Sequence, residues 1–274
     1  MARRWMREQR TVCGEKYQEV DIYPICERQA KSSVRAKRAQ ASRESQVTLN
    51  ARHARRYLVQ LLAANFGPSD MHVTCTYADE HLPADPQAAG RDVVNFLRRV
   101  RARCKARGMG APAYIAVTEW RTEGEDGKAV RYHHHVVLRC GLSRDEVESL
   151  WSRGGERLGR VNADRLQPDH GSLEALAGYL VKYTNRKRRW RQSRGLRKPA
   201  RPRPNDSRWT GRAVENAVRC GDVYDRGYWQ KKYPGWLLRE AEAEYNEAWG
   251  EWHIVVKLWR PSLRAQGRRP SQSR

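Results

Sequence analysis

The sequence predicts a mixed α+β fold, and three short runs of residues carry that prediction. Residues 71–77 (MHVTCTY), 113–120 (AYIAVTEW) and 130–138 (VRYHHHVVL) alternate in polarity or are rich in β-branched and aromatic residues, as strands are. Around these runs lie segments in which apolar residues recur at helical spacing. Strands interspersed with amphipathic helices predict a sheet with helices packed on it.

The first predicted helix covers about residues 45–66. Its leucines recur at helical spacing, and the stretch GPSD that follows it ends the helix. The preceding residues, 1–44, are basic and lack a clear period, so we predict an N-terminal arm there. After the 71–77 strand, apolar residues at helical spacing in 93–104 predict a second helix, which Gly108 closes.

The middle of the chain predicts a hairpin followed by shorter elements. RTEGEDGKA joins the 113–120 and 130–138 strands, and its Gly and Asp content suits the loop of an antiparallel hairpin. Ser143 and Glu146 then have the spacing of a helix capping box. RVNADRL predicts a short strand, and GSLEALAGYLVKYTNRK a helix capped near Ser172.

Changes in composition along the chain predict its domains. Ten of the eighteen residues between Arg186 and Arg203 are Lys or Arg and none is acidic, which indicates a linker or a loop ordered by DNA. The Trp- and Tyr-rich stretch 233–259 is predicted to be helical. We therefore predict a basic arm (1–44), a compact domain (45–190), a basic linker (191–210), a C-terminal helical region (211–260) and a disordered tail (261–274).

The charge of the chain favours a polyanionic partner. Its 54 Lys and Arg against 31 Asp and Glu give a net charge of +23, so nucleic acid is the first candidate. No apolar run approaches the roughly 18 residues of a membrane span, and no hydrophobic segment follows the charged N-terminus. We expect a cytoplasmic protein with no membrane partner. The six cysteines form no CxxC pair, which favours reduced thiols over a metal site that includes Cys13 and Cys26.

The three consecutive histidines predict a metal site. Side chains alternate along a strand, so His133 and His135 share one face about 6 to 7 Å apart, while His134 points to the other face. Glu119, on the strand expected to pair with theirs, can supply a carboxylate. Two imidazoles, one carboxylate and open positions suit Mg²⁺ or Mn²⁺ acting on phosphate. The alternative is that these histidines only line a polar sheet face.

The helix that contains YLVKY predicts a functional face. At about 100° per residue, Tyr179, Lys182, Tyr183 and Arg186 fall on one stripe about 100° wide. The leucines and alanines of the same helix form a separate apolar stripe that can anchor it. The alternatives are tyrosines that only pack and a basic face that only meets solvent or DNA.

Together these motifs resemble the HUH endonuclease superfamily, and in particular its two-tyrosine replication initiators. The resemblance covers roughly residues 45–190: HVTCTY resembles the first motif, HHH the His-hydrophobic-His metal motif, and YLVKY the nucleophile helix. The metal motif precedes the tyrosines, as in replication initiators, and the last motif is especially similar to that of gene A proteins of isometric single-stranded DNA phages and related plasmid Rep proteins. His134 departs from the aliphatic residue usual there, so either a neutral histidine lies in the core or the ligand pair differs.

The resemblance implies an α+β fold with a central antiparallel sheet of about five strands and packed helices. It implies site-specific nicking of single-stranded or supercoiled origin DNA, through a 5′-phosphotyrosine, to begin rolling-circle replication of a plasmid or phage in a bacterial host. Tyr179 or Tyr183 would be the nucleophile, assisted by Lys182, beside a divalent ion on His133, His135 and Glu119. Host helicase and polymerase would be partners. The residues expected to contact DNA are Thr74, Thr76, Arg186, Lys187, Arg188, Arg189 and Arg191.

Two alternatives remain open from the sequence. The first is a single-tyrosine transposase or mobilisation relaxase of the same superfamily, which would differ in motif order and in whether both tyrosines react. The second is a non-catalytic nucleic-acid-binding protein, which would need stacking aromatic residues on the exposed sheet face. The predicted strands carry His, Thr and Glu there instead. No phosphate-loop motif of a helicase occurs in the chain.

Overall fold

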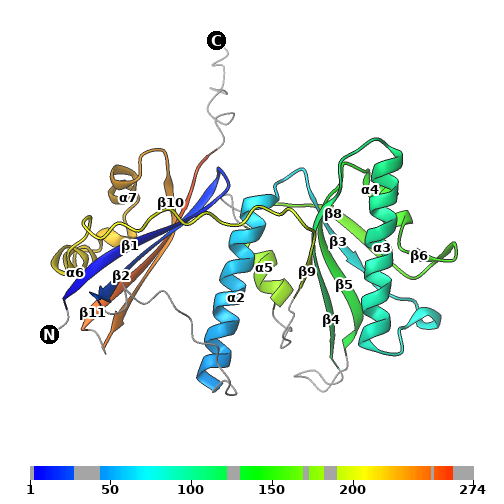
Figure 1. Ribbon diagram of the computed structural model, residues 1–274, viewed down its shortest axis with the longest axis horizontal. Coiled ribbons are helices and arrows are strands. Elements are labelled where there is room, and N and C mark those ends of the chain that lie inside the picture. Colours follow the sequence, from blue (N-terminus) through cyan, green and yellow to red (C-terminus); the bar gives the residue numbers. More distant parts are fainter. Residues whose placement is uncertain are drawn as a thin grey trace, which may run out of the picture. The chain divides into compact units, whose positions relative to one another are not determined.

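The computed structural model describes residues 3–27, 44–121, 130–168, 173–181, 190–247 and 250–261. Contacts divide the chain into two compact units, whose elements are labelled in Figure 1. The terminal unit contains the residues up to Asn65 and those from Lys198 onward, and the central unit contains Phe66–Pro168 and Leu173–Arg197. The predicted tail after residue 261 lies outside the described residues.

The central unit contains the five-stranded antiparallel sheet, so the predicted fold class is confirmed. Its strand order is β8-β3-β5-β4-β9, and each neighbouring pair is antiparallel. The strands β4 and β5 form the predicted hairpin, with β5 at the centre of the sheet. The strands are β3 (Met71–Cys75), β4 (Ala113–Arg121), β5 (Val130–Arg139), β8 (Val161–Arg165) and β9 (Arg191–Gln192).

Helices and one small hairpin complete the central unit. These elements are η1 (Asp79–His81), α3 (Pro86–Ala106), α4 (Arg144–Ser149), α5 (Glu174–Val181), β6 (Ser152–Arg153) and β7 (Glu156–Arg157). The helix α3 begins where the Asp85 side chain accepts a hydrogen bond from the Ala88 amide, with Pro86 in the first turn. The helix α4 has the predicted capping box between Ser143 and Glu146.

The two faces of the five-stranded sheet have different roles. Apolar residues of α3, such as Val93, Phe96 and Val100, pack with Val136 and Leu138 of β5 in one buried cluster. The helix α5 lies on the other side of the sheet (Figure 1). Residues of β5 therefore alternate between the α3 core and the α5 side, which is what separates His134 from its two neighbours.

Gly159 lets the chain pass close to the end of β3. A Cβ atom at this position would lie 2.5 Å from the Thr76 carbonyl oxygen and 2.6 Å from the Ala78 amide nitrogen. Thr76 and Ala78 donate backbone hydrogen bonds to Arg160 and Leu158 on either side of the glycine. Only glycine fits this approach without moving backbone.

The terminal unit has a four-stranded antiparallel sheet that the sequence did not predict. Its strand order is β1-β2-β11-β10, so strands from the two ends of the chain pair in its middle. The elements are β1 (Arg4–Cys13), β2 (Tyr17–Cys26), α2 (Glu44–Asn65), α6 (Gly211–Arg219), η2 (Asp222–Tyr224), α7 (Arg226–Lys232), β10 (Leu237–Asn246) and β11 (Glu251–Trp259).

Three predictions for the chain ends need correction. The expected basic arm contains the hairpin β1–β2, and the expected C-terminal helical region ends in the hairpin β10–β11 after its helices α6 and α7. The expected linker is also ordered in part: Asn205 and Ala200 exchange backbone hydrogen bonds with Glu8 and Val12 on the outer edge of β1. These segments gain their structure from pairing partners far away in the sequence.

A second core lies under α6 and α7. It joins Trp209, Trp229 and Trp236 to inward residues of the four strands, such as Ile22 and Val256. The indole Nε1 of Trp209 donates to the buried Glu8 carboxylate, and that of Trp229 donates to the Val223 carbonyl oxygen. The tryptophan-rich C-terminal region therefore serves the core of this unit.

Candidate metal centre and active site

The register of three strands brings together Glu119, His133 and His135. Glu119 of β4 pairs with His133 of β5, and His135 pairs with Thr74 of β3 on its other side. Residues that pair directly in an antiparallel sheet project on the same face. All of these side chains therefore lie on the face opposite α3.

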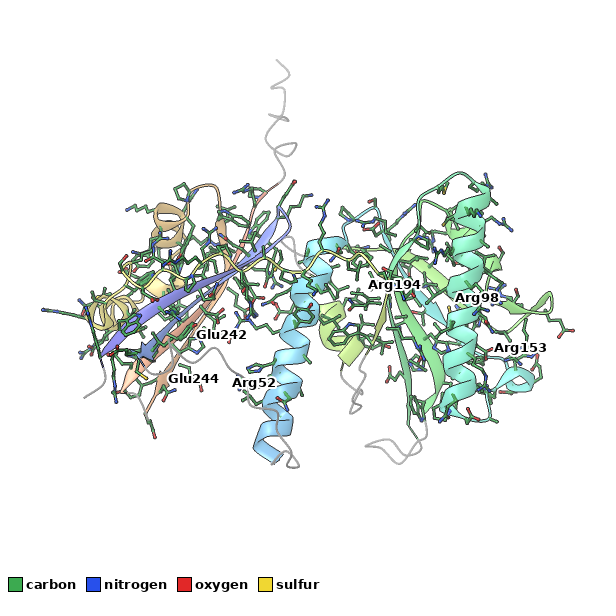
Figure 2. All side chains as sticks on the ribbon, viewed as in Figure 1. Arg52, Arg98, Arg153, Arg194, Glu242 and Glu244 are labelled. Carbon is green, nitrogen blue, oxygen red and sulfur yellow. The ribbon has the colours of Figure 1, made fainter. Side chains whose placement is uncertain are left out.

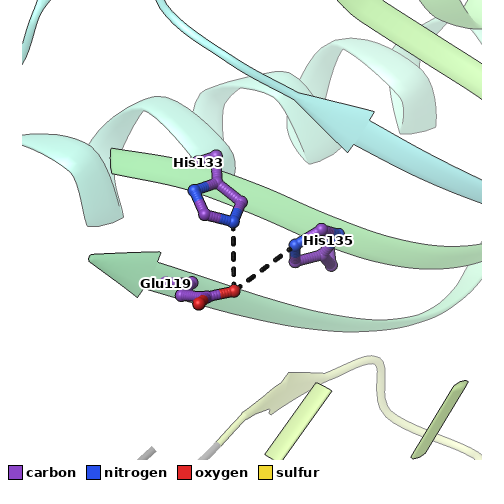
Figure 3. A group of neighbouring side chains, drawn as sticks. All are labelled: Glu119, His133 and His135. Atoms are coloured by element: carbon purple, nitrogen blue, oxygen red, sulfur yellow. Dashed lines mark hydrogen bonds and ion pairs between the residues drawn. The ribbon is translucent and has the colours of Figure 1, made fainter. Parts of the chain in front are cut away.

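The three predicted ligand residues form a compact, largely buried cluster (Figure 3). One oxygen of Glu119, Oε2, lies 3.0 Å from His133 Nε2 and 3.7 Å from His135 Nε2. The exposed fraction of the side chain is 8% for Glu119, 18% for His133 and 3% for His135. Their potential ligand atoms all lie within 4.8 Å of one another.

The hydrogen-bonding partners of His133 favour a cation in this cluster. Its Nδ1 lies 2.9 Å from the carbonyl oxygen of Arg131, which can only accept, so Nδ1 carries a proton. Its Nε2 faces the carboxylate of Glu119, which also accepts when ionised. Both contacts are satisfied either by a doubly protonated ring or by a neutral ring whose Nε2 lone pair and the carboxylate share a cation.

His135 is held in place with one ring nitrogen unused. Its Nδ1 lies 3.2 Å from Nε2 of His72 and 3.4 Å from Oγ1 of Thr74, whereas its buried Nε2 has no hydrogen-bond partner. Burial lowers the pKa of His135 to about 3, and the neighbouring His133 and His72 add to this effect. A neutral ring with its Nε2 directed at Glu119 is the form that binds a metal ion.

This donor set fits a divalent metal ion. Ligand atoms at about 2.1 Å from one ion lie about 3 to 4 Å apart, close to the separations in the cluster. The orphaned Nε2 of His135 and the acceptor pair at His133 would both be satisfied by that ion. The cluster can therefore hold a metal ion, and His72 acts as the orienting partner behind one ligand.

His134 lies in the core on the opposite face, as strand alternation predicts. The residue is fully buried, and its Nδ1 and Nε2 lie 2.9 Å from Thr118 Oγ1 and 2.8 Å from the Tyr77 hydroxyl. Burial lowers the pKa of His134 to about 3, so the ring is neutral. Tyr77 in turn donates to Asp92, which accepts two hydrogen bonds from Arg153. The residue that departs from the family pattern thus has its polar atoms satisfied within the core.

Tyr179 reaches the metal cluster from α5. Its ring lies edge-on to His135 with the centroids 4.9 Å apart, and the residue is 47% exposed. A phenol that is half exposed beside the cluster is accessible to a substrate. The other residues predicted on this helix face or just beyond it lie outside the described residues: Lys182, Tyr183, Arg186, Lys187, Arg188 and Arg189.

The remaining residues expected to contact DNA lie in three different places. Thr74 lies beside His135 at the cluster, and the Thr76 hydroxyl donates to the Arg160 carbonyl oxygen at the surface. Arg191 of β9 pairs with Ala116, whose side chain faces the α3 core, so Arg191 lies on the α3 side of the sheet. The sequence assigned no role to His72, although its alternation with Thr74 placed it on the polar face of the strand.

One comparison with known proteins matches the part of the chain that holds the cluster. Residues 70–188 match the family model of the replication-associated protein ORF2 and gene 2 protein. That span contains Glu119, His133, His135 and Tyr179, so the similarity supports a replication-associated, initiator-like protein that binds DNA. No curated protein and no solved structure gave a significant match to the chain. Among the described residues, no helix is long and apolar enough to cross a membrane.

Proposed function

We propose that this protein is a metal-dependent, HUH-type endonuclease that nicks single-stranded origin DNA to begin rolling-circle replication. The observation that carries the proposal is the position of Tyr179, whose ring lies 4.9 Å from that of His135 in the Glu119–His133–His135 cluster. A nucleophilic phenol beside a cation site is what phosphodiester transesterification requires. The similarity of residues 70–188 to replication-associated proteins supports a DNA substrate.

The residues of the cluster have distinct tasks in this proposal. A divalent ion held by Glu119, His133 and His135 would neutralise charge on the scissile phosphate. His72 and Thr74 hold the His135 ring so that Nε2 points toward Glu119. The buried surroundings of Glu119 and His135 strengthen these electrostatic interactions by excluding water.

The phenol oxygen of Tyr179 or Tyr183 forms the new bond to phosphorus. The phosphorus–O3′ bond breaks, the phenol loses its proton, and the departing 3′ oxygen gains one, which leaves a 5′-phosphotyrosine and a free 3′-OH. A phenol has a pKa near ~10, so Lys182 is assigned to favour the phenolate or to bind the phosphate. The 3′-OH would then prime synthesis by a host polymerase with a host helicase.

Capture of a covalent protein–DNA adduct tests this function. The protein is incubated with a single-stranded DNA library of random sequence and Mn²⁺, denatured, and analysed for linked DNA. We expect adducts in Mn²⁺ and none in excess EDTA or with His135→Ala. Each of Tyr179→Phe and Tyr183→Phe should retain some adduct, and the double variant none. Tyr224→Phe, which changes a 59% exposed tyrosine of the terminal unit, is the matched control and should behave as wild type.

Mass spectrometry of the linked peptide decides which tyrosine reacts. We expect DNA on both tyrosines, with Tyr179 the more reactive because Lys182 follows it three residues later. DNA on Tyr179 alone would favour a single-tyrosine enzyme of the same superfamily. Adducts on neither residue, or full activity in EDTA, would reject the endonuclease.

A further inference from the structure

The outer face of α3 carries positive charge that no part of the mechanism above uses. The helix contains six Lys and Arg residues and one acidic residue, Asp92. Asp92 is buried and accepts hydrogen bonds from Tyr77 and Arg153, so it offers no negative charge on the outer face.

Part of this positive charge is already paired. Glu146 contacts both Arg103 and Arg107, and Nε of Arg99 donates to the Leu150 carbonyl oxygen. The other four cations of the helix are exposed and contact no carboxylate among the described residues. They are Arg91, Arg98, Arg101 and Lys105.

These four cations lie along one stripe. At about 100° per residue they fall within about 80° of arc, and the helical rise places the first and last about 21 Å apart. We call them the α3 stripe. A row of like charges this close together is unfavourable without a counterion, and a polyanion supplies one along the whole length.

The last turns of α3 also border a depression. Its volume is about 380 Å³, and three members of the stripe, Arg98, Arg101 and Lys105, surround it. The other lining residues are Ala102, Met109, Gly110 and Ala111. No aromatic ring lines the depression, whereas proteins that bind unpaired bases stack them on aromatic rings. Its lining favours the sugar–phosphate backbone over a single-stranded base.

The α3 stripe lies on the side of the sheet away from the metal cluster. The apolar face of α3 covers the same sheet face as His134, and the cluster lies on the other face. Arg191 extends the charge toward the sheet edge, since its guanidinium lies 3.3 Å from where a Cβ of Gly90 would be. Figure 2 marks Arg98 on α3 and Arg194 in the segment after β9.

We propose that the α3 stripe is a second DNA-binding surface, which contacts the phosphates of duplex DNA next to the strand cleaved at the metal cluster. The charge complementarity of four unpaired cations and the lack of aromatic residues carry this inference. It rests on the proposed function only in taking DNA as the ligand. The origin would then contact both sides of the five-stranded sheet, its single strand on one and its duplex on the other.

Salt-dependent binding to a short DNA duplex of random sequence tests the proposal. The variant is Arg98→Gln/Arg101→Gln/Lys105→Gln, and the control Arg212→Gln/Arg226→Gln/Lys231→Gln removes the same charge from exposed positions of the terminal unit. Each lost phosphate contact lowers the slope of log K against log salt by about 0.9, so the α3 variant should lose about 2 to 3. The control should lose less than about 1, because its cations lie outside the proposed surface.

The other outcomes separate this proposal from the endonuclease assignment. An unchanged slope, or equal losses in both variants, would overturn the α3 surface. Adduct formation with the single-stranded library should be unaffected in the α3 variant; its loss would place the stripe within the nicking site and contradict a separate surface. If the wild type forms no adduct, the endonuclease fails, but the slopes still decide whether α3 binds duplex DNA.

Discussion

A single histidine shows how one strand serves two faces. His134 is surrounded by the core, yet its two ring nitrogens contact Thr118 and Tyr77, while its neighbours His133 and His135 face the metal cluster. A buried polar ring costs little when both nitrogens have partners, and much when its partners are left alone. The sequence alternation separates the two roles, but it does not name the partners.

Replacing His134 tests that separation. We expect His134→Leu to lower the free energy of unfolding by about 1 to 3 kcal/mol, because the hydroxyls of Tyr77 and Thr118 lose a buried partner. Its affinity for Mn²⁺ should stay close to wild type, since the ring faces away from the cluster. Urea unfolding and calorimetric titration measure the two quantities. A loss of affinity as large as that of His135→Ala would contradict the face assignment.

His72 is expected to act on the metal through His135. We expect His72→Ala to weaken Mn²⁺ binding about 10- to 100-fold with little loss of stability, because an orienting partner of a ligand is removed. His72→Gln, whose amide oxygen can accept from Nδ1 of His135, should recover part of the affinity. The absorption spectrum of bound Co²⁺ provides a direct readout of the ligand geometry. An unchanged affinity and spectrum in His72→Ala would make this residue a packing residue only.

At the scale of elements, helix α2 is joined to its sheet through ionic contacts. The Arg56 guanidinium donates two hydrogen bonds to Asp21, at 2.8 and 2.7 Å, and a third to Glu19. Gln60 of the same helix also donates to Glu19, whose side chain is 1% exposed. Removing one partner of such a buried pair leaves an uncompensated charge, which is more costly than the pair itself.

This contact predicts a loss of stability in acid. Burial opposes ionisation of Asp21, but the ionic contacts with His253 and Arg56 outweigh it and hold the pKa of Asp21 below its usual value. The stabilisation is complete above the unfolded pKa of about 3.9 and is lost as the pH falls through the lower folded value. In urea unfolding from about pH 7 to about pH 2.5, Asp21→Asn should therefore flatten the acid dependence. Glu242→Gln, at an exposed residue of β10, should not flatten it.

The elements that the sequence predicted correctly are those with an undisturbed period. The strands β3, β4 and β5 and helix α3 follow the expected alternation or helical spacing, and Glu119 came from pairing two neighbouring strands. The terminal strands escaped because their inward positions include polar residues such as Glu8 and Glu19, which hide a period of two. In β10 the repeated Glu and Ala favour helix intrinsically, and pairing with β11 overrides that preference.

Part of the site could not be predicted for the same kind of reason. Nothing in the local sequence states that β3 lies beside β5, and that neighbourhood is what brings His72 to His135 and Tyr77 to His134. The order of strands in a sheet follows from the packing of the whole unit. Period-two alternation therefore located the ligands but missed their supporting contacts.

At the scale of the whole molecule, a metal ion should affect the two units differently. The ligands all belong to the central unit, and each unit has its own apolar core. A ligand at about 100 times its Kd stabilises the form that binds it by about 2.7 kcal/mol. We expect Mn²⁺ to slow amide hydrogen exchange in β4 and β5 and to leave β10 and β11 unchanged. Equal protection of both sheets, or protection that persists in His135→Ala, would contradict this expectation.

The strand order of the terminal sheet also has a consequence for the newly made chain. The strand β2 pairs with β11, so the hairpin β1–β2 leaves the ribosome first and must wait for the last strands before its sheet is complete. A two-stranded hairpin is marginal by itself, and pairing across so long a stretch of sequence is slow. The central unit can fold in the meantime, because all of its strands have been synthesised before residue 198. A chain interrupted after α7 would therefore carry an intact metal cluster beside an unfinished sheet.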